Sequence, residues 1–325
     1  MKFFKIIKYI PLVIINYFLL FFLIYIISGY LLLRGITPKS KLINTYQVNF
    51  YLEGGVRNLW QNNPDCVDFD KDLIYVPKFR SCNFKNIEFD TNISFDKFGR
   101  ASNHPDKEKN KNQSIAVIGD SYAMGWGVND DETFSHILEN KINKNVYNLA
   151  VSSYGTRREL IRLEKSGLLD LIDTVIIQYC YNDFGENKSF KINSESDSKK
   201  KFETITSSQP SSNWRKFRRT FRYSAQIPID LIQKKSNSLD FIPHQNLLLN
   251  VLNEYPSIMS KKIYVFYTNG PNLKFSNFPN GKILNYDNIY FLDINIKDNH
   301  YFKIDGHLNK NGHKFIAEEL SKVIY

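Results

Sequence analysis

Apolar and polar positions alternate in blocks along most of the chain. Short runs rich in β-branched and aromatic residues predict strands at about 114–120, 145–151, 173–180, 262–268 and 289–294. Longer stretches between them, with apolar residues three or four positions apart, predict helices at about 131–142, 156–167, 240–255 and 309–323. This alternation predicts an α/β fold in which helices cover both faces of a mostly parallel sheet.

The amino-terminal residues follow a different pattern. Lys8 and Arg34 bracket 25 residues, from Tyr9 to Leu33, that carry no charge. A bilayer core requires about 20 apolar residues, whereas a cleaved signal peptide has an apolar region of about 7–15 residues and a small-x-small cleavage site. Ser28-Gly29 is a poor cleavage site and lies inside the run. We therefore predict that residues 1–34 form an uncleaved transmembrane signal anchor.

Three further segments lack a clear period. Residues 35–95 are polar and aromatic and are predicted to connect the anchor to a domain at 96–325, with a hairpin or entry turn at 95–100. Residues 187–212 are rich in serine and lysine and predict a loop or a mobile flap. Trp214–Tyr223 has aromatic residues at helical spacing among arginines, which predicts a short amphipathic helix. Its aromatic side chains either pack on the domain or meet a membrane surface or an anionic glycan.

Composition narrows the choice of partners. The formal net charge of +10 would suit nucleic acid or an anionic membrane surface. The lysines are scattered, however, and no nucleic-acid recognition motif accompanies them, so we expect no nucleic-acid partner. The hydrophobic share of 42% and the charged share of 23% are ordinary for a globular protein.

The three cysteines leave two readings open. Cys66 and Cys82 flank a short segment and could pair in an oxidising compartment, but an odd count is also what free thiols would give. Cys180 falls in a predicted buried strand and would behave as a small apolar residue. There is no Cys-x-x-Cys spacing, and we predict neither a metal site nor a cofactor.

The chemistry-bearing residues lie at the ends of predicted strands. The apolar run Ile115–Ile118 is followed by Gly119-Asp120-Ser121, which indicates a buried strand that ends in a tight turn. A serine there lies at the carboxyl end of a strand, where open α/β sheets bind their ligands. The alternative is a serine that only caps the next helix. Asp120 is expected to act mainly as a turn residue.

Three other blocks favour the catalytic reading of the serine. Asp305-Gly306-His307 could supply a base for the serine and a carboxylate that orients the base. Asn182 follows the strand at 173–180, and its amide could donate a hydrogen bond to an oxyanion. Residues 146–156 form a third strand that ends in the small residues Ser153 and Gly155. Asp183 is expected to form a cap or another local hydrogen bond.

In this order along the chain, the four blocks resemble the SGNH (GDSL-type) hydrolase superfamily. That family carries its nucleophile in Gly-Asp-Ser, its oxyanion donors in a glycine block and an asparagine block, and an Asp/His pair near the carboxyl end. The resemblance covers about residues 95–325 and rests on all four motifs together. It implies a three-layer, flavodoxin-like α/β fold with a mostly parallel sheet, preceded here by one transmembrane helix.

The resemblance also implies roles for individual residues. Ser121 would be the nucleophile, His307 the base and Asp305 the partner of the base. The oxyanion would be bound by the Ser121 N–H, a main-chain N–H at Ser153 or Gly155, and the Asn182 amide.

The chain departs from the family pattern at two places. Ser153 stands where the second block usually has glycine, although the main-chain N–H is kept. Asp305-x-His307 is closer than the common Asp-x-x-His and resembles the subgroup that acetylates or deacetylates bacterial exopolysaccharides. His313 is a rival for the base, but it follows Asn309, where the last helix is expected to begin, and a histidine in a helix more often serves as a cap or packing residue.

These motifs favour an enzyme over a binding protein. The expected activity is that of a serine esterase or an O-acyltransferase, with an acylated, above all an acetylated, carbohydrate of the cell envelope or a small ester as substrate. The alternative is a catalytically silent, membrane-tethered protein that binds or assembles glycans. We expect a single-pass membrane protein whose catalytic domain lies outside the cytoplasm, in the periplasm or at the cell surface.

Overall fold

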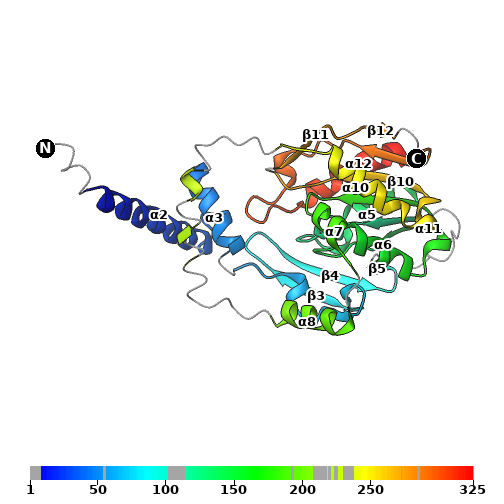
Figure 1. Ribbon diagram of the computed structural model, residues 1–325, viewed down its shortest axis with the longest axis horizontal. Coiled ribbons are helices and arrows are strands. Elements are labelled where there is room, and N and C mark those ends of the chain that lie inside the picture. The colour runs from blue at the N-terminus through cyan, green and yellow to red at the C-terminus, as the bar shows by residue number, and fades with distance from the viewer. Residues whose placement is uncertain are drawn as a thin grey trace. The chain divides into compact units, whose positions relative to one another are not determined.

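The structure, a computed structural model of the chain, describes residues 9–53, 56–101, 114–191, 194–207, 218, 221–222, 226–229, 238–271, 273–283 and 286–324. The chain divides into two compact units, which are treated separately below (Figure 1). Unit 1 comprises Met1–Asn58, Asn86–Glu88 and Gln209–Ser236. Unit 2 comprises Leu59–Lys85, Phe89–Ser208 and Asn237–Tyr325.

A six-stranded sheet organises unit 2. Its strands run in the order β12-β13-β10-β8-β6-β7, with the bounds β6 Ser114–Ile118, β7 Val146–Asn148, β8 Ile172–Tyr179, β10 Lys262–Tyr267, β12 Gly281–Lys282 and β13 Ile289–Leu292. All pairs are parallel except β12 with β13. Numbered along the chain, the five parallel strands lie in the order 2-1-3-4-5, which is the flavodoxin-like order. The predicted fold class is therefore confirmed.

Alternate side chains of the strands enter two separate cores. In β6, Ile115 and Val117 face one core, and Ala116 and Ile118 face the other. Because neighbouring residues of a strand point to opposite faces, a strand between two helical layers must be apolar on both sides. All five residues of β6 are accordingly buried.

The helices form the outer two layers (Figure 1). Residues of α5 (Phe134–Ile142) and α12 (Lys310–Ile324) belong to the first core. Residues of α6 (Thr156–Lys165) and α10 (Ile242–Asn253) belong to the second core. All four helices overlap the ranges that the sequence predicted. The shorter elements of unit 2 are η1 Trp60–Asn62, α4 Ser121–Met124, η2 Asp130–Glu132, η3 Leu169–Leu171, α7 Asp183–Ser189, β9 Ser238–Asp240, α11 Pro256–Met259, β11 Lys274–Ser276 and η4 Asp298–His300.

The prediction of a loop over residues 187–212 is wrong in part, because helix α8 occupies Glu195–Thr206. Ser194 caps this helix by accepting a hydrogen bond from the Asp197 N–H at 3.2 Å. Phe202 and Ile205 then pack against the first core. The two apolar side chains lie three positions apart among lysines and serines, so the sequence shows only a weak helical period.

Short antiparallel strands precede the sheet. β1 (Val67–Asp70) pairs with β2 (Ile74–Pro77), and β3 (Ser81–Lys85) pairs with β4 (Asp90–Asp96). β4 then turns into β5 (Gly99–Arg100), which confirms the predicted hairpin. Of the two readings for the cysteines, the structure has the disulfide, between Cys66 and Cys82, and Cys180 is buried as a free thiol.

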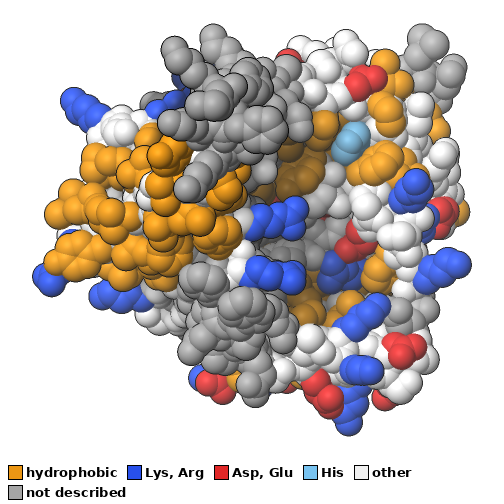
Figure 2. Space-filling view, turned by 60° about the vertical axis from the view of Figure 1, so that its left-hand side comes forward, with side chains coloured by type: hydrophobic (Ala, Val, Ile, Leu, Met, Phe, Trp, Pro, Cys, Tyr) orange, Lys and Arg blue, Asp and Glu red, His pale blue; other side chains and the backbone are white. Residues whose placement is uncertain are grey.

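Unit 1 contains the apolar helix α2 (Ile10–Leu33) and helix α3 (Lys41–Glu53). α2 is long and apolar enough to cross a membrane, a description that signal sequences also meet. Its exposed apolar side chains form part of the hydrophobic surface in Figure 2. Near its end, Gly29 packs so closely on Phe50 of α3 that a Cβ would lie 2.4 Å from the ring. Of the predicted helix at 214–223, only residues 218, 221 and 222 are described, and these three are helical.

The disulfide should stabilise unit 2. It joins residues 16 positions apart, and closing a loop of about 15 residues lowers the entropy of the unfolded chain by an amount worth about 3 kcal/mol. We expect the double substitution Cys66→Ser, Cys82→Ser to lower the free energy of unfolding in urea by about this amount. Treatment of the unsubstituted protein with a reductant should have the same effect, and an unchanged unfolding midpoint after reduction would contradict the prediction.

Candidate active site

Ser121 lies at the carboxyl end of β6, as its sequence position indicated. The strand ends at Ile118, and Ser121 begins the one-turn helix α4. Gly119 makes the turn between them with a φ of +154°. A Cβ on Gly119 would lie 2.7 Å from the side-chain oxygen of Gln178, so only glycine fits between the two strands here.

Gln178 fixes this turn from the neighbouring strand β8. Its Oε1 accepts hydrogen bonds from the N–H groups of Asp120 at 3.1 Å and of Ala123 at 3.3 Å. Its Nε2 donates to Thr268 Oγ1 at 3.1 Å, just after β10. The fully buried amide therefore joins the ends of three strands.

His307 and Asp305 lie on a tight loop between η4 and α12. The Gly306 N–H donates to the Phe302 carbonyl at 3.1 Å, and the Phe302 N–H donates to the His307 carbonyl at 2.7 Å. Gly306 has a φ of +79°, a backbone conformation that glycine adopts without strain. The aspartate and histidine side chains meet although only one residue separates them.

The structure brings the serine, the histidine and the aspartate into one hydrogen-bonded chain. Ser121 Oγ lies 2.7 Å from His307 Nε2, and His307 Nδ1 lies 2.5 Å from Asp305 Oδ1. The serine and the histidine are 186 positions apart in the sequence. An imidazole held by a carboxylate on one nitrogen can accept the serine proton on the other, which is the arrangement that activates a serine for nucleophilic attack.

His313 takes no part in the hydrogen bonds that join Ser121, His307 and Asp305. It is fully buried in α12, where its Nδ1 accepts a hydrogen bond from the Phe134 N–H at 3.2 Å. Its ring stacks on the Phe134 ring with the centroids 5.9 Å apart. Burial lowers the pKa of His313 to about 3, so the ring stays neutral. It serves as a packing residue between α5 and α12.

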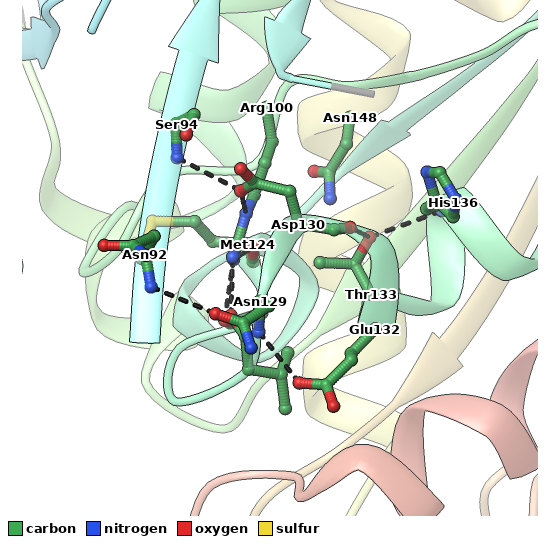
Figure 3. A network of polar contacts seen from close by, with 12 residues as sticks. Asn92, Ser94, Arg100, Met124, Asn129, Asp130, Glu132, Thr133, His136 and Asn148 are labelled. Carbon is green, nitrogen blue, oxygen red and sulfur yellow. Dashed lines mark hydrogen bonds and ion pairs between the residues drawn. The ribbon is translucent and has the colours of Figure 1, made fainter. Parts of the chain in front are cut away.

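A buried arginine holds the far end of α4 (Figure 3). Arg100 donates to the carbonyl oxygens of Met124, of Gly125 at 2.6 Å and of Val128 at 2.6 Å. Its Nε donates to Asp130 at 2.8 Å. The carbonyl groups at the end of a helix lack partners within the helix, and here one guanidinium binds three carbonyls of the segment that follows Ser121.

The other predicted oxyanion donors lie on two loops at the same edge of the sheet. Ser153 is exposed in the turn after β7, Gly155 is buried at the start of α6, and Asn182 is exposed just before α7. Among the described residues, the N–H groups of Ser121, Ser153 and Gly155 and the side-chain amide of Asn182 have no protein hydrogen-bond partner. They are therefore free to donate to a substrate.

Two of these positions have different backbone requirements. Ser153 has a φ of +63°, in the left-handed region that favours glycine. Gly155 has an extended backbone, but a Cβ there would lie 2.8 Å from Glu186 of α7. The glycine at 155 is thus required for packing against α7, whereas Ser153 occupies a glycine-like turn position.

Buried acids surround the site. Burial raises the pKa of Asp120 to about 6, although the Tyr122 N–H and His307 oppose the shift. Burial and nearby carboxylates also raise the pKa of Asp183 and of Glu159 well above their ordinary values. Asp120 accepts from the Tyr122 N–H at 2.9 Å, and Asp183 accepts from the Cys180 N–H at 3.0 Å. These local hydrogen bonds agree with the sequence prediction, and Asp183 also accepts from the distant Thr156 Oγ1 at 3.4 Å.

A polar cavity of about 310 Å³ lies beside the site, at the carboxyl ends of β10 and β13. Tyrosines, amides and charged groups line it: Tyr267, Asn269, Lys274, Asp293, Asp298 and Tyr301. Gly270 in its wall is so close to Tyr122 that a Cβ would lie 2.9 Å from the tyrosine hydroxyl. The Tyr122 ring in turn lies 4.7 Å from the His307 ring. Among the described residues, no three side chains of His, Cys, Asp or Glu are grouped as metal ligands.

The comparisons with known proteins found matches among solved structures only. No protein-family model matches the chain, and no curated protein matches it. Among solved structures, a family two carbohydrate esterase from Clostridium thermocellum is 15% identical, with a TM-score of 0.34, and the match covers 69% of this chain and 66% of that one. The chain thus spans just under two thirds of that esterase.

Two smaller proteins are also similar. A psychrotrophic esterase from Pseudoalteromonas is 14% identical with a TM-score of 0.33, over 66% of this chain and 97% of that one. A proposed lipolytic protein of the G-D-S-L family from Desulfitobacterium hafniense is 16% identical with a TM-score of 0.28, over 65% and 99%.

The sequence did not point to several residues that hold the site. Arg100 was predicted only as part of a turn, and Gln178 only as part of a strand. Gln61 and Tyr75 contact the turn at Ser153, but they lie about 80–90 positions before it. A single polar residue in an irregular segment carries no local pattern, so only the tertiary contacts reveal these roles.

The raised pKa of Asp120 makes the stability of the fold depend on pH. Between pH 3.8 and about 6 the unfolded chain has lost this proton while the folded chain keeps it, so the folded state loses stability as the pH rises through this window. A shift of about two units corresponds to about 3 kcal/mol. Asp120→Asn keeps the oxygen that accepts from Tyr122 but does not titrate.

We therefore expect the free energy of unfolding of the natural protein to fall by about 2–2.5 kcal/mol relative to Asp120→Asn between pH 4 and pH 7, because the unfolded carboxyl is already partly ionised at pH 4. Urea unfolding of both proteins across this range measures the difference. A difference that stays constant with pH would show that Asp120 ionises normally in the folded protein.

Proposed function

We propose that this chain is a serine esterase or O-acyltransferase of the SGNH type that acts on an acylated carbohydrate of the cell envelope. The observation that carries the proposal is the hydrogen-bonded chain of Ser121, His307 and Asp305. These residues come from distant segments, and a hydroxyl, an imidazole and a carboxylate in series are the groups that acyl transfer requires. The four sequence motifs point to the same residues.

In the first half of the proposed reaction, the Ser121 oxygen attacks the carbonyl carbon of the ester. The hydroxyl proton moves to His307 Nε2, while Nδ1–H donates to Asp305, which holds the ring and stabilises its positive charge. The tetrahedral intermediate collapses when the C–O bond to the alcohol breaks. His307 gives its proton to the departing alcohol oxygen, and the acyl group remains on Ser121.

In the second half, a water molecule or a sugar hydroxyl attacks the acyl-serine. Its proton moves to His307 Nε2 as the new C–O bond forms, and His307 then returns a proton to the Ser121 oxygen as the acyl group leaves. Water yields hydrolysis, and a sugar hydroxyl yields transfer. Both routes use the same three residues.

The oxyanion of each intermediate would be bound by N–H donors that have no partner among the described residues of the protein. We assign this role to the Ser121 N–H, the Ser153 N–H and the Asn182 amide, and we place Gly155 in a packing role because α7 lies against it. Removing one such donor typically lowers the rate about 10²–10³-fold.

Carbohydrate is the proposed substrate class because of the polar cavity near Tyr122. Tyrosine rings offer flat apolar faces, and amides and carboxylates bind hydroxyl groups, which together suit a sugar. The similar esterase from Clostridium thermocellum is described in complex with cellohexaose. The alternative function, a silent glycan-binding protein, would use the same cavity without turnover.

Two observations support the proposal that the protein is anchored in a membrane with its catalytic domain outside the cytoplasm. The first is the exposed, apolar α2, which is proposed as an uncleaved anchor. The second is the Cys66–Cys82 disulfide, because disulfides form and persist in oxidising compartments outside the cytoplasm.

The test of the activity uses the full chain in detergent. We expect a fluorophosphonate to label Ser121, as found by peptide mapping, and the protein to release p-nitrophenol from its acetate ester. Ser121→Ala should abolish both, because the nucleophile is lost. Full activity of this variant would refute the assignment, and a folded natural protein that neither reacts nor turns over would favour the silent glycan-binding alternative.

The two histidines supply a matched pair of variants. His307→Ala should lower kcat by about 10⁴-fold or more, because the base is lost. His313→Ala should lower the free energy of unfolding by about 1–2 kcal/mol but keep most of the activity, because only packing is lost. A folded but inactive His313→Ala variant beside an active His307→Ala variant would require another base.

The anchor is tested independently of activity. We expect mass spectrometry of the protein extracted from membranes to find peptides that precede Arg34, because the apolar run has no good cleavage site. Alkaline phosphatase fused to the carboxyl end should be active. A chain that begins near residue 30, or an inactive fusion, would contradict this topology.

A further inference from the structure

The turn that carries Ser153 has a strained backbone. Residues Val151 to Tyr154 form a turn closed by a hydrogen bond from the Tyr154 N–H to the Val151 carbonyl at 3.1 Å. Ser153, the third residue, has a φ of +63°, whereas Ser152 is not among the residues with positive φ. This is the pattern of a type II turn, which favours glycine at the third position. A residue with a side chain there costs about 1–2 kcal/mol.

A distant tyrosine binds the central peptide group of this turn. The hydroxyl of Tyr75, in β2, donates to the Ser152 carbonyl oxygen at 2.6 Å. That carbonyl and the Ser153 N–H belong to one planar, trans peptide group, so they point in opposite directions. By holding the carbonyl, Tyr75 therefore fixes the direction of the Ser153 N–H, which points away from the tyrosine.

Two other side chains complete the support of the turn. Gln61 bonds both serines, since Ser152 Oγ donates to its Oε1 and its Nε2 donates to Ser153 Oγ, each at 3.1 Å. Arg158 donates to the Ser153 carbonyl at 2.5 Å and is itself held by an ion pair with Glu186 at 2.6 Å. These contacts hold the side chains and the following carbonyl, but of the residues that the structure describes, only Tyr75 binds the central peptide group.

Without Tyr75, the turn has a less strained alternative. Rotation of the Ser152–Ser153 peptide by about 180° converts a type II turn into a type I turn, in which the third residue has a negative φ. For serine this change relieves the strain, and it turns the N–H toward the side that Tyr75 now occupies. The tyrosine is 1% exposed, and burial raises its pKa to about 12, so its hydroxyl keeps its proton as a donor.

We propose that Tyr75 is a positioning residue that holds the Ser152–Ser153 peptide in the orientation that presents the Ser153 N–H to the oxyanion. The proposal rests on the proposed function, because acyl transfer is the reaction that forms an oxyanion at this place. It assigns a role in the chemistry to the disulfide-closed segment that precedes the sheet, since Tyr75 lies between Cys66 and Cys82.

The test compares Tyr75→Phe in two backgrounds, the natural chain and the Ser153→Gly variant, with p-nitrophenyl acetate as substrate. In the natural background we expect kcat to fall about 10–100-fold with KM changed less than about twofold, because a misdirected donor affects the transition state more than the bound ester. Glycine adopts positive φ without strain. In the Ser153→Gly background the same substitution should therefore lower kcat at most about threefold.

Tyr264→Phe is the matched control. Its hydroxyl also donates to a main-chain carbonyl, that of Val323, at 3.0 Å, and its side chain is 3% exposed. It lies in β10, which β8 and β6 separate from β7, the strand that precedes the turn at Ser153. We expect Tyr264→Phe to lower the melting midpoint about as much as Tyr75→Phe and to leave kcat within about twofold of the natural value.

The outcomes separate this proposal from the proposed function. If the natural protein turns over the ester but Tyr75→Phe behaves like Tyr264→Phe, or loses equal activity in both backgrounds, Tyr75 does not position the donor. If the natural protein has no activity, the proposed function fails. The structure of the Tyr75→Phe variant then tests whether Tyr75 sets the orientation of the Ser152–Ser153 peptide. A negative φ at Ser153 in that structure would show that Tyr75 holds the Ser152–Ser153 peptide in its orientation, and a positive φ would overturn this part of the proposal.

Discussion

Parallel pairing of five strands is the constraint from which the site follows. Such strands all end at one edge of the sheet, and the strand order reverses between β6 and β8. Ser121 follows β6, the turn at Ser153 follows β7, and Asn182 follows β8. Because the sheet collects these ends, residues that are far apart in the chain meet over short loops. The two apolar cores on either side hold the strands in this order.

Much of this arrangement can be predicted from local patterns in the sequence. Apolar runs between turn residues identify the five parallel strands, because a strand covered on both faces must be apolar throughout. The same logic places Ser121, Asn182 and the Asp305–His307 pair at strand ends or in the last loop. The structure adds that Ser121, His307 and Asp305 form one hydrogen-bonded chain. It also shows why glycine stands at 119 and at 306.

The parts that the sequence could not predict depend on contacts between distant segments. Nothing near Tyr75 or Gln61 shows that they will bind the turn at Ser152 and Ser153. Likewise, Arg100 is buried with its charge, which lowers the stability of the fold unless its N–H donors have acceptors. The carbonyl groups that accept from it lie about 25 residues further along the chain. The sequence does not predict the helix at 195–206, because its apolar face consists of only two side chains, Phe202 and Ile205, in a lysine-rich segment.

The buried amide of Gln178 has a mechanical consequence for the whole edge of the sheet. One side chain receives two N–H groups of the turn at Ser121 and bonds the hydroxyl of Thr268. Strands in a sheet can slide or twist slightly against each other, but the hydrogen bonds of this amide hold the ends of β6, β8 and β10 at fixed distances. A displacement at the end of β10, beside the polar cavity, is therefore transmitted to the backbone that carries the reactive serine.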